Sequence, residues 1–464
     1  MTAPGAADAA PNPSTVRKVA LAACTATSIE WYDFFIYLTA AALVFPTLFF
    51  AEGLNPTVAV LASFSTAAVG FVARPVGGAL FGHFGDRFGR KPTLVFALVM
   101  MGVASTLIGL LPTYATIGSL AALLLVLLRF IQGLAIGGQW GGAALLATEY
   151  APEDKRGFYG SFAQIGVPVG LIIGNVVFLV LSGSLSEEAF LAWGWRVPFL
   201  LSVLLIGLAM YIQLRIEDTP AYRQLEEKAR KRQEEEGAPV QEGSPLIEVF
   251  RNHPKQVLLA AGAYIVVNGT FYIMITGTLD YGTRNLGLEQ STMLAIVLFG
   301  ASAGLIANPG FGALSDLLGR RRVYMAGAVL MGLWAFPMFW LMDTATPVLM
   351  ILALVVGNSV LAMMYGPQAA LFAEMFSARV RYSGASMGYQ IASVFAGGLA
   401  PIIMTYLLDA TGTSASVSVY IVVMAAITLL SVYLVTETFE DEMAEDQARE
   451  SRTEASGSRD TVAS

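Results

Sequence analysis

Cysteine and histidine are nearly missing from this sequence, which contains one cysteine, Cys24, and two histidines, His83 and His253. A single cysteine cannot close a disulfide within the chain, and these three side chains are too few for a metal site built from Cys and His ligands. A loop of the form GxxxxGK[ST], which would cradle the phosphates of ATP, is also absent. We therefore expect no metal, no other cofactor and no direct use of ATP.

Charged residues are scarce as well. They make up 13% of the 464 residues, against 56% hydrophobic residues, whereas a soluble domain carries about 25% charged residues. The formal charge of −7 comes largely from two acidic segments, residues 217–248 and 437–460. This composition predicts a polytopic membrane protein and gives no support to nucleic-acid binding. A membrane enzyme is disfavoured, because no set of nucleophile, base and orienting residue is evident.

The beginning of the chain lacks the features of a cleavable signal peptide. Its first 16 residues are rich in Ala and Pro and contain no cation before Arg17 and Lys18. We expect residues 1–18 to form a disordered leader and the first apolar run to remain as a membrane span.

Long apolar runs are what the sequence has in abundance. A helix needs about 20 residues to cross the hydrocarbon core of a bilayer, and polar or Gly/Pro-containing breaks divide the chain into twelve runs of roughly this length. The fold class predicted is therefore an all-α membrane protein with twelve transmembrane helices in two sets of six. The predicted spans are residues 21–49, 57–81, 93–111, 119–147, 158–182, 196–214, 256–279, 291–313, 323–342, 346–372, 384–408 and 415–435.

A short charged turn occurs at matching places in both sets. Residues 82–91 read GHFGDRFGRK, and residues 312–322 read GALSDLLGRRR. Such charges between two spans must lie at the membrane surface, and the glycines allow a sharp turn. The repeat divides the chain into two pseudo-symmetric six-helix bundles, 19–215 and 256–436, a cytoplasmic linker with an amphipathic helix, 216–255, and a disordered acidic tail, 437–464.

The distribution of Lys and Arg predicts the orientation. If both termini face the cytoplasm, the outer side carries only Arg196 and Arg284, and Arg74 and Arg129 lie within spans. All other cations then lie on the inner side, as the positive-inside rule requires. Both termini and both glycine-rich turns are therefore predicted to be cytoplasmic.

Four further segments carry a resemblance to a known family: IEWYDFFIY, RFIQGLAIGGQWGGA, AQIGVPVG and YGPQAALFAEMFSARVRYSGAS, at residues 29–37, 129–143, 163–170 and 365–386. With the repeated turn, they resemble the major facilitator superfamily and, within it, the metabolite:proton symporter family, over residues 20–436. The resemblance implies an inner-membrane symporter that works by alternating access. Relatives import small organic acids, or zwitterionic osmoprotectants, together with protons.

Acids inside a span are costly, so they are the first candidates for coupling to protons. Glu30, Asp33 and Tyr37 recur at helical spacing and should share one helix face. Asp33 or Glu30 would take up the coupling proton. Alternatively, the acids are neutralised permanently by Arg74 or Arg129 and only hold helices together.

The two arginines within spans are the candidates for binding an anionic substrate. A guanidinium holds a carboxylate through two hydrogen bonds, which lysine does less well. Arg129 and Arg74 could instead be counter-ions of Asp33 or Glu30. The two roles are compatible, because a proton on the acid would free the arginine for the substrate.

Neutral polar residues complete the predicted binding site. At position 139, where relatives commonly carry an acid, this chain has Gln139, which cannot titrate. The seventh span offers aromatic and amide groups, and the tenth span adds Gln368. We therefore expect the second half to provide hydrogen bonds but no buried charge. Besides Arg129, Arg74 and Tyr37, the predicted substrate-binding residues are Gln139, Gln164, Tyr264, Asn268, Tyr272 and Gln390.

The glycine-rich turns are predicted to gate rather than bind. The resemblance implies that Asp86 and Asp316 each meet the N-terminus of a helix from the opposite half, where the helix dipole favours an anion. The repeat extends to charged residues at the inner ends of spans 4, 5 and 10. The predicted gating residues are Asp86, Arg87, Arg90, Glu149, Arg156, Asp316, Arg320, Glu374 and Arg381.

The function predicted is proton-coupled import of a small organic acid, with a small-molecule substrate, protons and the lipid bilayer as partners and a monomer as the working unit. An osmoprotectant symporter is the alternative, although the short tail lacks heptads. A drug:proton antiporter is less favoured, because the fifth span lacks a Gly-Pro pair followed by Gly-Gly. A channel is disfavoured, because paired inner gates imply two exclusive states.

Overall fold

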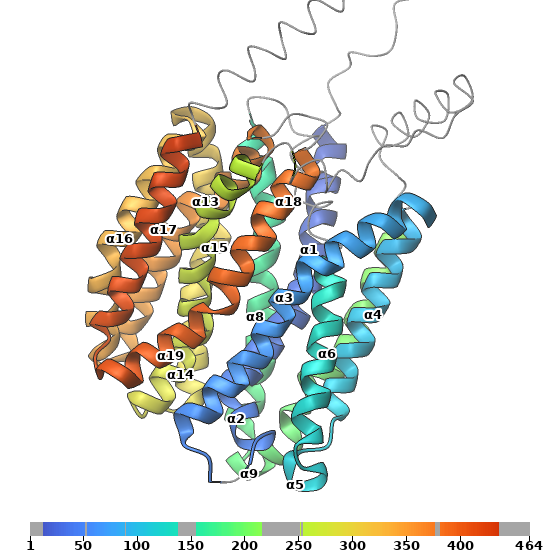
Figure 1. Ribbon diagram of the computed structural model, residues 1–464, viewed down its shortest axis with the longest axis vertical. Coiled ribbons are helices and arrows are strands. Elements are labelled where there is room, and N and C mark those ends of the chain that lie inside the picture. The colour runs from blue at the N-terminus through green and yellow to red at the C-terminus, as the bar shows by residue number, and fades with distance from the viewer. Residues whose placement is uncertain are drawn as a thin grey trace, which may run out of the picture.

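The computed structural model describes residues 13–51, 53–88, 90–137, 155–215, 251, 254–375 and 381–435, and these ranges contain helices and short connections but no strand (Figure 1). The predicted site residues Gln139 and Glu149 lie outside the described residues, as do most of the linker and the acidic tail. For five predicted gating residues only the backbone is described: Asp86, Arg87, Arg90, Glu374 and Arg381.

The first half consists of long helices joined by short ones. The long helices are α1 (Pro13–Leu43), α3 (Pro56–Phe88), α4 (Arg90–Leu110), α6 (Leu120–Gly137), α8 (Arg156–Ser184) and α10 (Arg196–Arg215). The connecting segments include α2 (Phe45–Leu48), α5 (Tyr114–Ile117), α9 (Glu187–Ala189) and the π-helical η2 (Phe190–Gly194).

The second half has the same number of long spans but more interruptions. Its seventh span combines α13 (Pro254–Tyr272), η3 (Ile273–Gly277), α14 (Thr278–Asp280) and η4 (Tyr281–Asn285). It continues with α15 (Gln290–Leu318), α16 (Arg320–Asp343), α17 (Pro347–Glu374), α18 (Arg381–Ala392), η5 (Ser393–Gly398), α19 (Ala400–Thr411) and a helix at Ala415–Val435.

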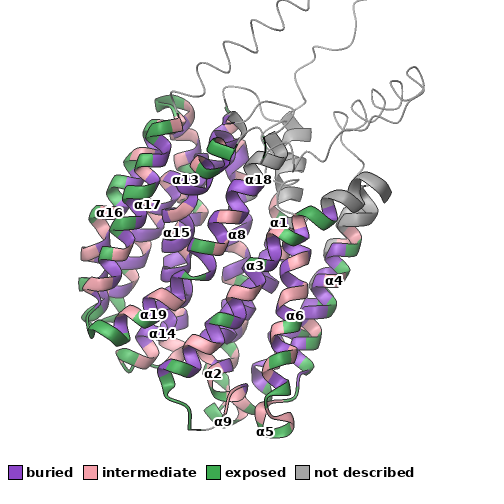
Figure 2. Ribbon diagram, in the orientation of Figure 1, coloured by how far each residue is buried: buried purple, intermediate pink, exposed green. Residues whose placement is uncertain are grey.

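The predicted fold class is confirmed. Each of the twelve predicted spans coincides with a helix or with consecutive helical segments, as far as the chain is described. Nine described helices are long and apolar enough to cross a membrane by themselves. Large apolar side chains such as Phe96, Leu204 and Leu333 are 63%, 69% and 67% exposed on the outside of the bundle, where lipid would cover them (Figure 2).

One boundary differs from the prediction at the start of the chain. Helix α1 begins at Pro13, so residues 13–18, which we predicted as part of a disordered leader, are helical. Proline fits the first turn of a helix, because its missing N–H has no intrahelical partner there.

The second glycine-rich turn has the conformation that its sequence requires. Gly319 separates α15 from α16 at φ 92° and donates its N–H to the Ser315 carbonyl at 3.0 Å. This left-handed region costs glycine nothing but strains other residues. The turn can therefore reverse the chain within a single residue.

The two halves meet along α8 and α15, which lie side by side in the middle of the molecule (Figure 1). A Cβ atom on Gly157 would lie 2.6 Å from the Gly312 carbonyl oxygen, and one on Gly312 would lie 2.7 Å from the Gly157 carbonyl oxygen. Only glycines allow the backbones to come this close. A second contact between the halves joins α3 to η5, where Phe71 packs against Gly397 and Gly398.

Candidate functional site

Two arginines are buried in the middle of the first half. Arg74 lies on α3 and Arg129 on α6, and each is only 1% exposed. The two helices touch through their backbones, because a Cβ atom on Gly133 would lie 2.2 Å from the Gly70 carbonyl oxygen. Close glycine contacts of this kind hold membrane helices together without large side chains. The arginines are therefore carried by one tightly packed helix pair.

Arg74 is surrounded by aromatic rings rather than by acids. Its guanidinium carbon lies 4.5 Å from the centres of the Phe34 and Phe71 rings and 5.7 Å from that of Trp31. None of its three guanidinium nitrogens has a hydrogen-bond partner among the described residues. The Tyr272 phenol of the second half lies beside the group as a hydrogen-bonding neighbour, although no hydrogen bond of normal geometry joins them, and Glu30 interacts with the group electrostatically.

Arg129 shares one of these rings. Its guanidinium carbon lies 4.6 Å from the centre of Phe34 and 4.1 Å from that of Tyr37. Nη1 donates a hydrogen bond to Oε1 of Gln132 at 3.1 Å, whereas Nε and Nη2 have no partner among the described residues. The ring faces attract the cation but do not satisfy its N–H groups.

The arginine pair therefore has unused capacity to bind an anion. Five of its six guanidinium nitrogens are buried without a hydrogen-bond partner in the described part of the chain. A buried charge without partners is costly, and a carboxylate could satisfy several of these nitrogens through charge-assisted hydrogen bonds. The described residues include no ion pair from either arginine to Asp33 or Glu30. Arg74 interacts electrostatically with Glu30 without such a direct ion pair, so the neutralising role of the arginines stays an alternative prediction.

Asp33 is buried in the first half as completely as the arginines. It is 1% exposed on α1, and its carboxylate accepts a hydrogen bond from Ser202 of α10. The hydroxyl of Ser105 on α4 also interacts with this carboxylate as a hydrogen-bonding group. Asp33 therefore faces α4 and α10 within its own bundle.

The other two residues of the predicted α1 face have different neighbours. Glu30 interacts electrostatically with Arg74 and with Tyr389 of the second half. The Tyr37 hydroxyl shares a hydrogen bond with that of Thr66 at 2.7 Å, while the Tyr37 ring covers Arg129. The helical spacing thus places Glu30 and Tyr37 near the arginines, whereas Asp33 faces the two serines, and of the two acids only Glu30 interacts with a residue of the other half.

The second half contributes phenols and amides. Tyr272 packs edge-on against Phe34 and Phe71, with ring centres 5.9 and 5.1 Å apart, and Tyr264 stacks on Tyr389 at 4.7 Å. The Asn268 amide donates to Ser393 at 3.0 Å. Among the described residues, unpaired buried amide atoms occur in Gln368 and Gln390 of this half, and also in Gln164 of α8 in the first half.

The expectation that the second half has no buried charge is wrong. Asp280 is 2% exposed and forms two hydrogen bonds with Arg284, Nε to Oδ1 at 3.0 Å and Nη2 to Oδ2 at 3.1 Å. We ended the seventh span at residue 279, but the π-helical segments η3 and η4 extend the helix through Asn285. The extra turn buries Asp280, while the Arg284 side chain stays 22% exposed.

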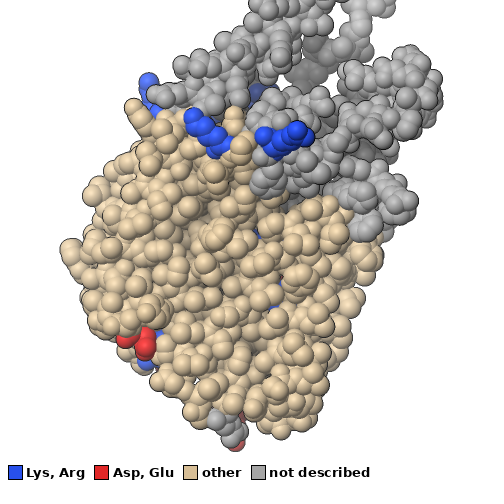
Figure 3. All heavy atoms as spheres, in the orientation of Figure 1, with Lys and Arg blue, Asp and Glu red and all other residues tan. Residues whose placement is uncertain are grey.

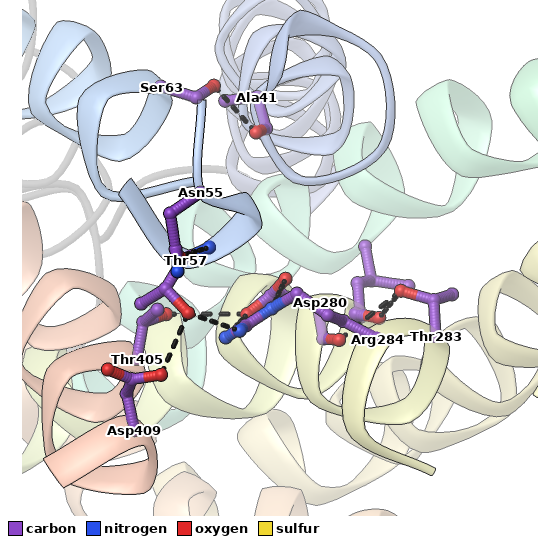
Figure 4. Close-up of polar contacts among 10 residues, drawn as sticks. Ala41, Asn55, Thr57, Ser63, Asp280, Thr283, Arg284, Thr405 and Asp409 are labelled. Carbon is purple, nitrogen blue, oxygen red and sulfur yellow. Dashed lines mark hydrogen bonds and ion pairs between the residues drawn. The ribbon is translucent and has the colours of Figure 1, made fainter. Parts of the chain in front are cut away.

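This pair belongs to a contact between the halves, which we call the Thr57 contact (Figure 4). Thr57, near the start of α3, donates its hydroxyl to Asp409 of α19 at 2.8 Å and accepts from Nη1 of Arg284 at 3.0 Å. Thr405 of α19 also donates to Asp280, at 3.4 Å. Thr57 of the first half is thus hydrogen-bonded to both an aspartate and an arginine of the second half.

The opposite end of the molecule has its own bridge, the Asp316 contact. Asp316 of α15 accepts hydrogen bonds from the backbone N–H groups of Gly157 at 2.9 Å and Phe158 at 3.0 Å, in the first turn of α8. Arg320 lies 3.6 Å from the same carboxylate. An anion at a helix N-terminus satisfies N–H groups that have no partner within the helix. The arrangement that the resemblance implied for Asp316 is therefore present, and Arg156 is the first residue of that helix.

A family model described as "Sugar (and other) transporter" matches residues 19–448 of the chain. The inner membrane metabolite transport protein YhjE of Escherichia coli (strain K12) is 41% identical over 426 residues, which are 91% of this chain and 94% of that protein. The shikimate transporter of the same strain is 38% identical over 427 residues, 92% of this chain and 95% of that protein.

More distant similarities agree. The proline/betaine transporter of Escherichia coli (strain K12) is 32% identical over 425 residues, 91% of this chain and 84% of that protein. A crystal structure of a D-xylose-proton symporter superposes with a TM-score of 0.70 at 18% identity, covering 91% of this chain and 97% of that one. This chain therefore belongs to the sugar (and other) transporter family of the major facilitator superfamily, and it is a multi-pass membrane transporter of small molecules rather than an enzyme.

Proposed function

We propose that this transporter imports a small organic acid, a mono- or dicarboxylate or a shikimate-like acid, together with one or more protons. The observation that carries the proposal is the buried arginine pair. Five guanidinium nitrogens of Arg74 and Arg129 lack hydrogen-bond partners among the described residues, and a carboxylate is the group that matches them best.

The second candidate is a proton symporter for a zwitterionic osmoprotectant, because the relatives include a proline/betaine transporter. Such a substrate also has a carboxylate, and Glu30 near Arg74 could face its cation. Two neighbouring guanidinium groups repel that cation, however, and a plain carboxylate avoids this cost. A drug antiporter with cationic substrates fits the arginine pair least.

Asp33 is the group that we assign to the coupling proton. It is buried next to two serine hydroxyls, and the described residues provide no cation in direct contact with it. An acid in these surroundings can exist with or without its proton, because hydroxyl groups both donate and accept hydrogen bonds. Tyr264, Asn268, Tyr272, Gln164 and Gln390 then select among acids, and Gln139 belongs to the same predicted set.

Alternating access would use two of the contacts between the halves. The Thr57 contact and the Asp316 contact lie at opposite ends of the molecule, so breaking one at a time would open the central arginines to one side. We assign the end of the Asp316 contact to the cytoplasm. On the face shown in Figure 3, most Lys and Arg gather at the end where α8 and α16 begin, and Asp and Glu lie at the other end.

With this orientation, both termini would face the cytoplasm and the protein would lie in the inner membrane. The working unit in this proposal is a monomer. The predicted gating residues at the cytoplasmic end, Asp86, Arg87, Arg90, Glu149, Glu374 and Arg381, would act with the Asp316 contact.

Replacing Asp316 by asparagine should open this end more often. An amide carries no charge to match the α8 N-terminus and offers one acceptor oxygen for two N–H groups. The loss of about 1–3 kcal/mol would raise the open population about 5- to 150-fold. Spin labels would be attached to cysteines introduced at Lys155 and Arg322 in a protein with Cys24→Ser. The fraction of molecules with a long distance between the two labels should then increase.

Asp343→Asn is the matched control, because Asp343 is bound by Tyr281 and Ser414 within the second half and makes no described contact with α8. It should leave the distance distribution unchanged. An Asp316→Asn distribution equal to that of the unmodified protein would show that this carboxylate does not hold the end closed.

The substrate class is tested with the purified full-length protein. We expect shikimate, 2-oxoglutarate, succinate or citrate to raise the thermal unfolding temperature, and the same compound to accumulate in proteoliposomes when the outside is more acidic than the inside. Proline and betaine serve as the comparison. If only betaine stabilises the protein and accumulates, the substrate is an osmoprotectant and not an organic acid. If the compound accumulates without a pH gradient, transport is not coupled to protons.

A further inference from the structure

Gln132 connects the buried acid to the buried arginine. It lies on α6, one turn after Arg129, and is 1% exposed. Its Oε1 accepts from Nη1 of Arg129 at 3.1 Å, and its Nε2 donates to the hydroxyl of Ser105 at 2.8 Å. Ser105, itself 0% exposed, interacts in turn with the Asp33 carboxylate. Two hydrogen bonds thus join Arg129 through Gln132 to Ser105, and Ser105 is a neighbour of the Asp33 carboxylate at the other end of this polar chain.

The direction of every bond in this chain follows from chemistry. A guanidinium only donates, so the amide of Gln132 must turn its oxygen to Arg129 and its NH2 group to Ser105. The Ser105 oxygen therefore accepts from Gln132, and its hydroxyl proton is free to be donated to Asp33. This arrangement fits an ionised Asp33, which can only accept.

We propose that Gln132 is a positioning residue that transmits the protonation of Asp33 to Arg129. The inference rests on the proposed function, because it assumes that Asp33 carries the proton and that Arg129 holds the carboxylate. When Asp33 gains a proton, it donates to Ser105, whose own proton then points to Gln132. The amide rotates to present its oxygen to Ser105, and its NH2 group faces the N–H groups of Arg129.

Two donors cannot bond to each other, so Arg129 loses its only hydrogen-bond partner among the described residues. All its nitrogens become available to an anion, and carboxylate binding is favoured in the protonated state. By reciprocity, a bound carboxylate favours protonation of Asp33 to the same degree. The atoms balance, because a single proton arrives at Asp33 and every other change is a rotation of a hydroxyl or an amide.

Few other charges could account for such a response. Around Asp33, α1 itself adds Glu30 and the Tyr32 phenol, α3 adds Arg74, and α6 adds Arg129. The described side chains of α4 include no charged group, and α10 and α8 carry theirs at their ends, with Arg196 and Arg215 on α10 and Arg156 on α8. Serine hydroxyls are thus the direct neighbours of the carboxylate.

Two serines next to the same acid provide a matched comparison. Ser105→Ala removes the residue that links Asp33 to Gln132. Ser202→Ala also removes a hydrogen bond to Asp33, but Ser202 has no part in the connection from Asp33 to Arg129. The measurement is the dissociation constant of the full-length protein for the carboxylate that stabilises it most among shikimate, 2-oxoglutarate, succinate, citrate and benzoate, from pH 5 to pH 8.

The unmodified protein should bind up to about tenfold more tightly per unit decrease in pH over the range in which Asp33 titrates, as expected for one coupled proton. Ser202→Ala removes a direct hydrogen bond to Asp33, so it should keep this slope only within the pH range in which its own Asp33 titrates. Ser105→Ala and Gln132→Met should lose most of this dependence while their affinity at pH 5 changes less than about threefold. A purely structural role of Gln132 would instead lower the affinity equally at every pH.

An unchanged pH dependence in Ser105→Ala and Gln132→Met would overturn the role of Gln132 and leave the proposed function intact. An equal loss in Ser105→Ala and Ser202→Ala would also overturn it, because the effect would then belong to Asp33 alone. If no carboxylate of the panel binds to the unmodified protein, the proposed function fails, and the role of Gln132 fails with it.

Discussion

Asp33→Asn is expected to abolish the accumulation of a carboxylate driven by a pH gradient, while exchange of internal for external carboxylate continues. Asparagine can still bond to Ser202 and Ser105, but it cannot gain or lose a proton. Each coupled proton supplies up to about tenfold accumulation per unit of pH difference. In proteoliposomes with a difference of two pH units, one proton would give up to about 100-fold, and the variant should give none.

The matched variant is Glu30→Gln, which neutralises the other acid of α1, near Arg74 and Tyr389. We expect it to retain accumulation and to change substrate affinity instead. If Asp33→Asn still concentrates the carboxylate while Glu30→Gln does not, Glu30 carries the proton and the assignment of Asp33 is wrong.

Arg129→Lys should weaken carboxylate binding about 10- to 100-fold, which corresponds to roughly 1.4–3 kcal/mol for lost hydrogen bonds to a charged group. Lysine keeps the charge but loses the planar fork that binds both oxygens of a carboxylate. It also loses the stacking on Tyr37 and the bond to Gln132. Isothermal titration calorimetry on the purified variant measures the effect.

Arg321→Lys is the control, because Arg321 lies at the end of the molecule against Tyr433 and far along the chain from the buried pair. It should bind as tightly as the unmodified protein. Arg74→Lys should weaken binding in the same range as Arg129→Lys. Affinities unchanged in both buried variants would mean that the carboxylate binds elsewhere.

The membrane-spanning helices could be predicted because lipid imposes a simple rule. A backbone in hydrocarbon must satisfy its hydrogen bonds within a helix, and a span of about 20 apolar residues is visible in the sequence. The repeated turn similarly marked the two halves, and Gly319 has the left-handed conformation for which glycine is suited. Arg74 and Arg129 stood out because charges within spans are rare.

Most partners of these charges could not be predicted, because they come from other helices. Ser105 and Ser202 are unremarkable in the sequence, and only the packing of α1, α4 and α10 brings them to Asp33. Gln132 lies one turn after Arg129 on α6, but its bond to Ser105 depends on the packing of α6 against α4. Asp280 was missed for a different reason, since the π-helical segments lengthen the seventh span beyond its predicted end. Gln139 and Glu149 remain predictions from sequence.

The most direct test of the arginine pair as the substrate site is an experimental structure of the full-length protein at acidic pH with its bound carboxylate. The account predicts carboxylate oxygens about 2.7–2.9 Å from nitrogens of Arg129 or Arg74, the distance of a charge-assisted hydrogen bond. A carboxylate bound anywhere else, with the same five guanidinium nitrogens still lacking partners, would contradict it.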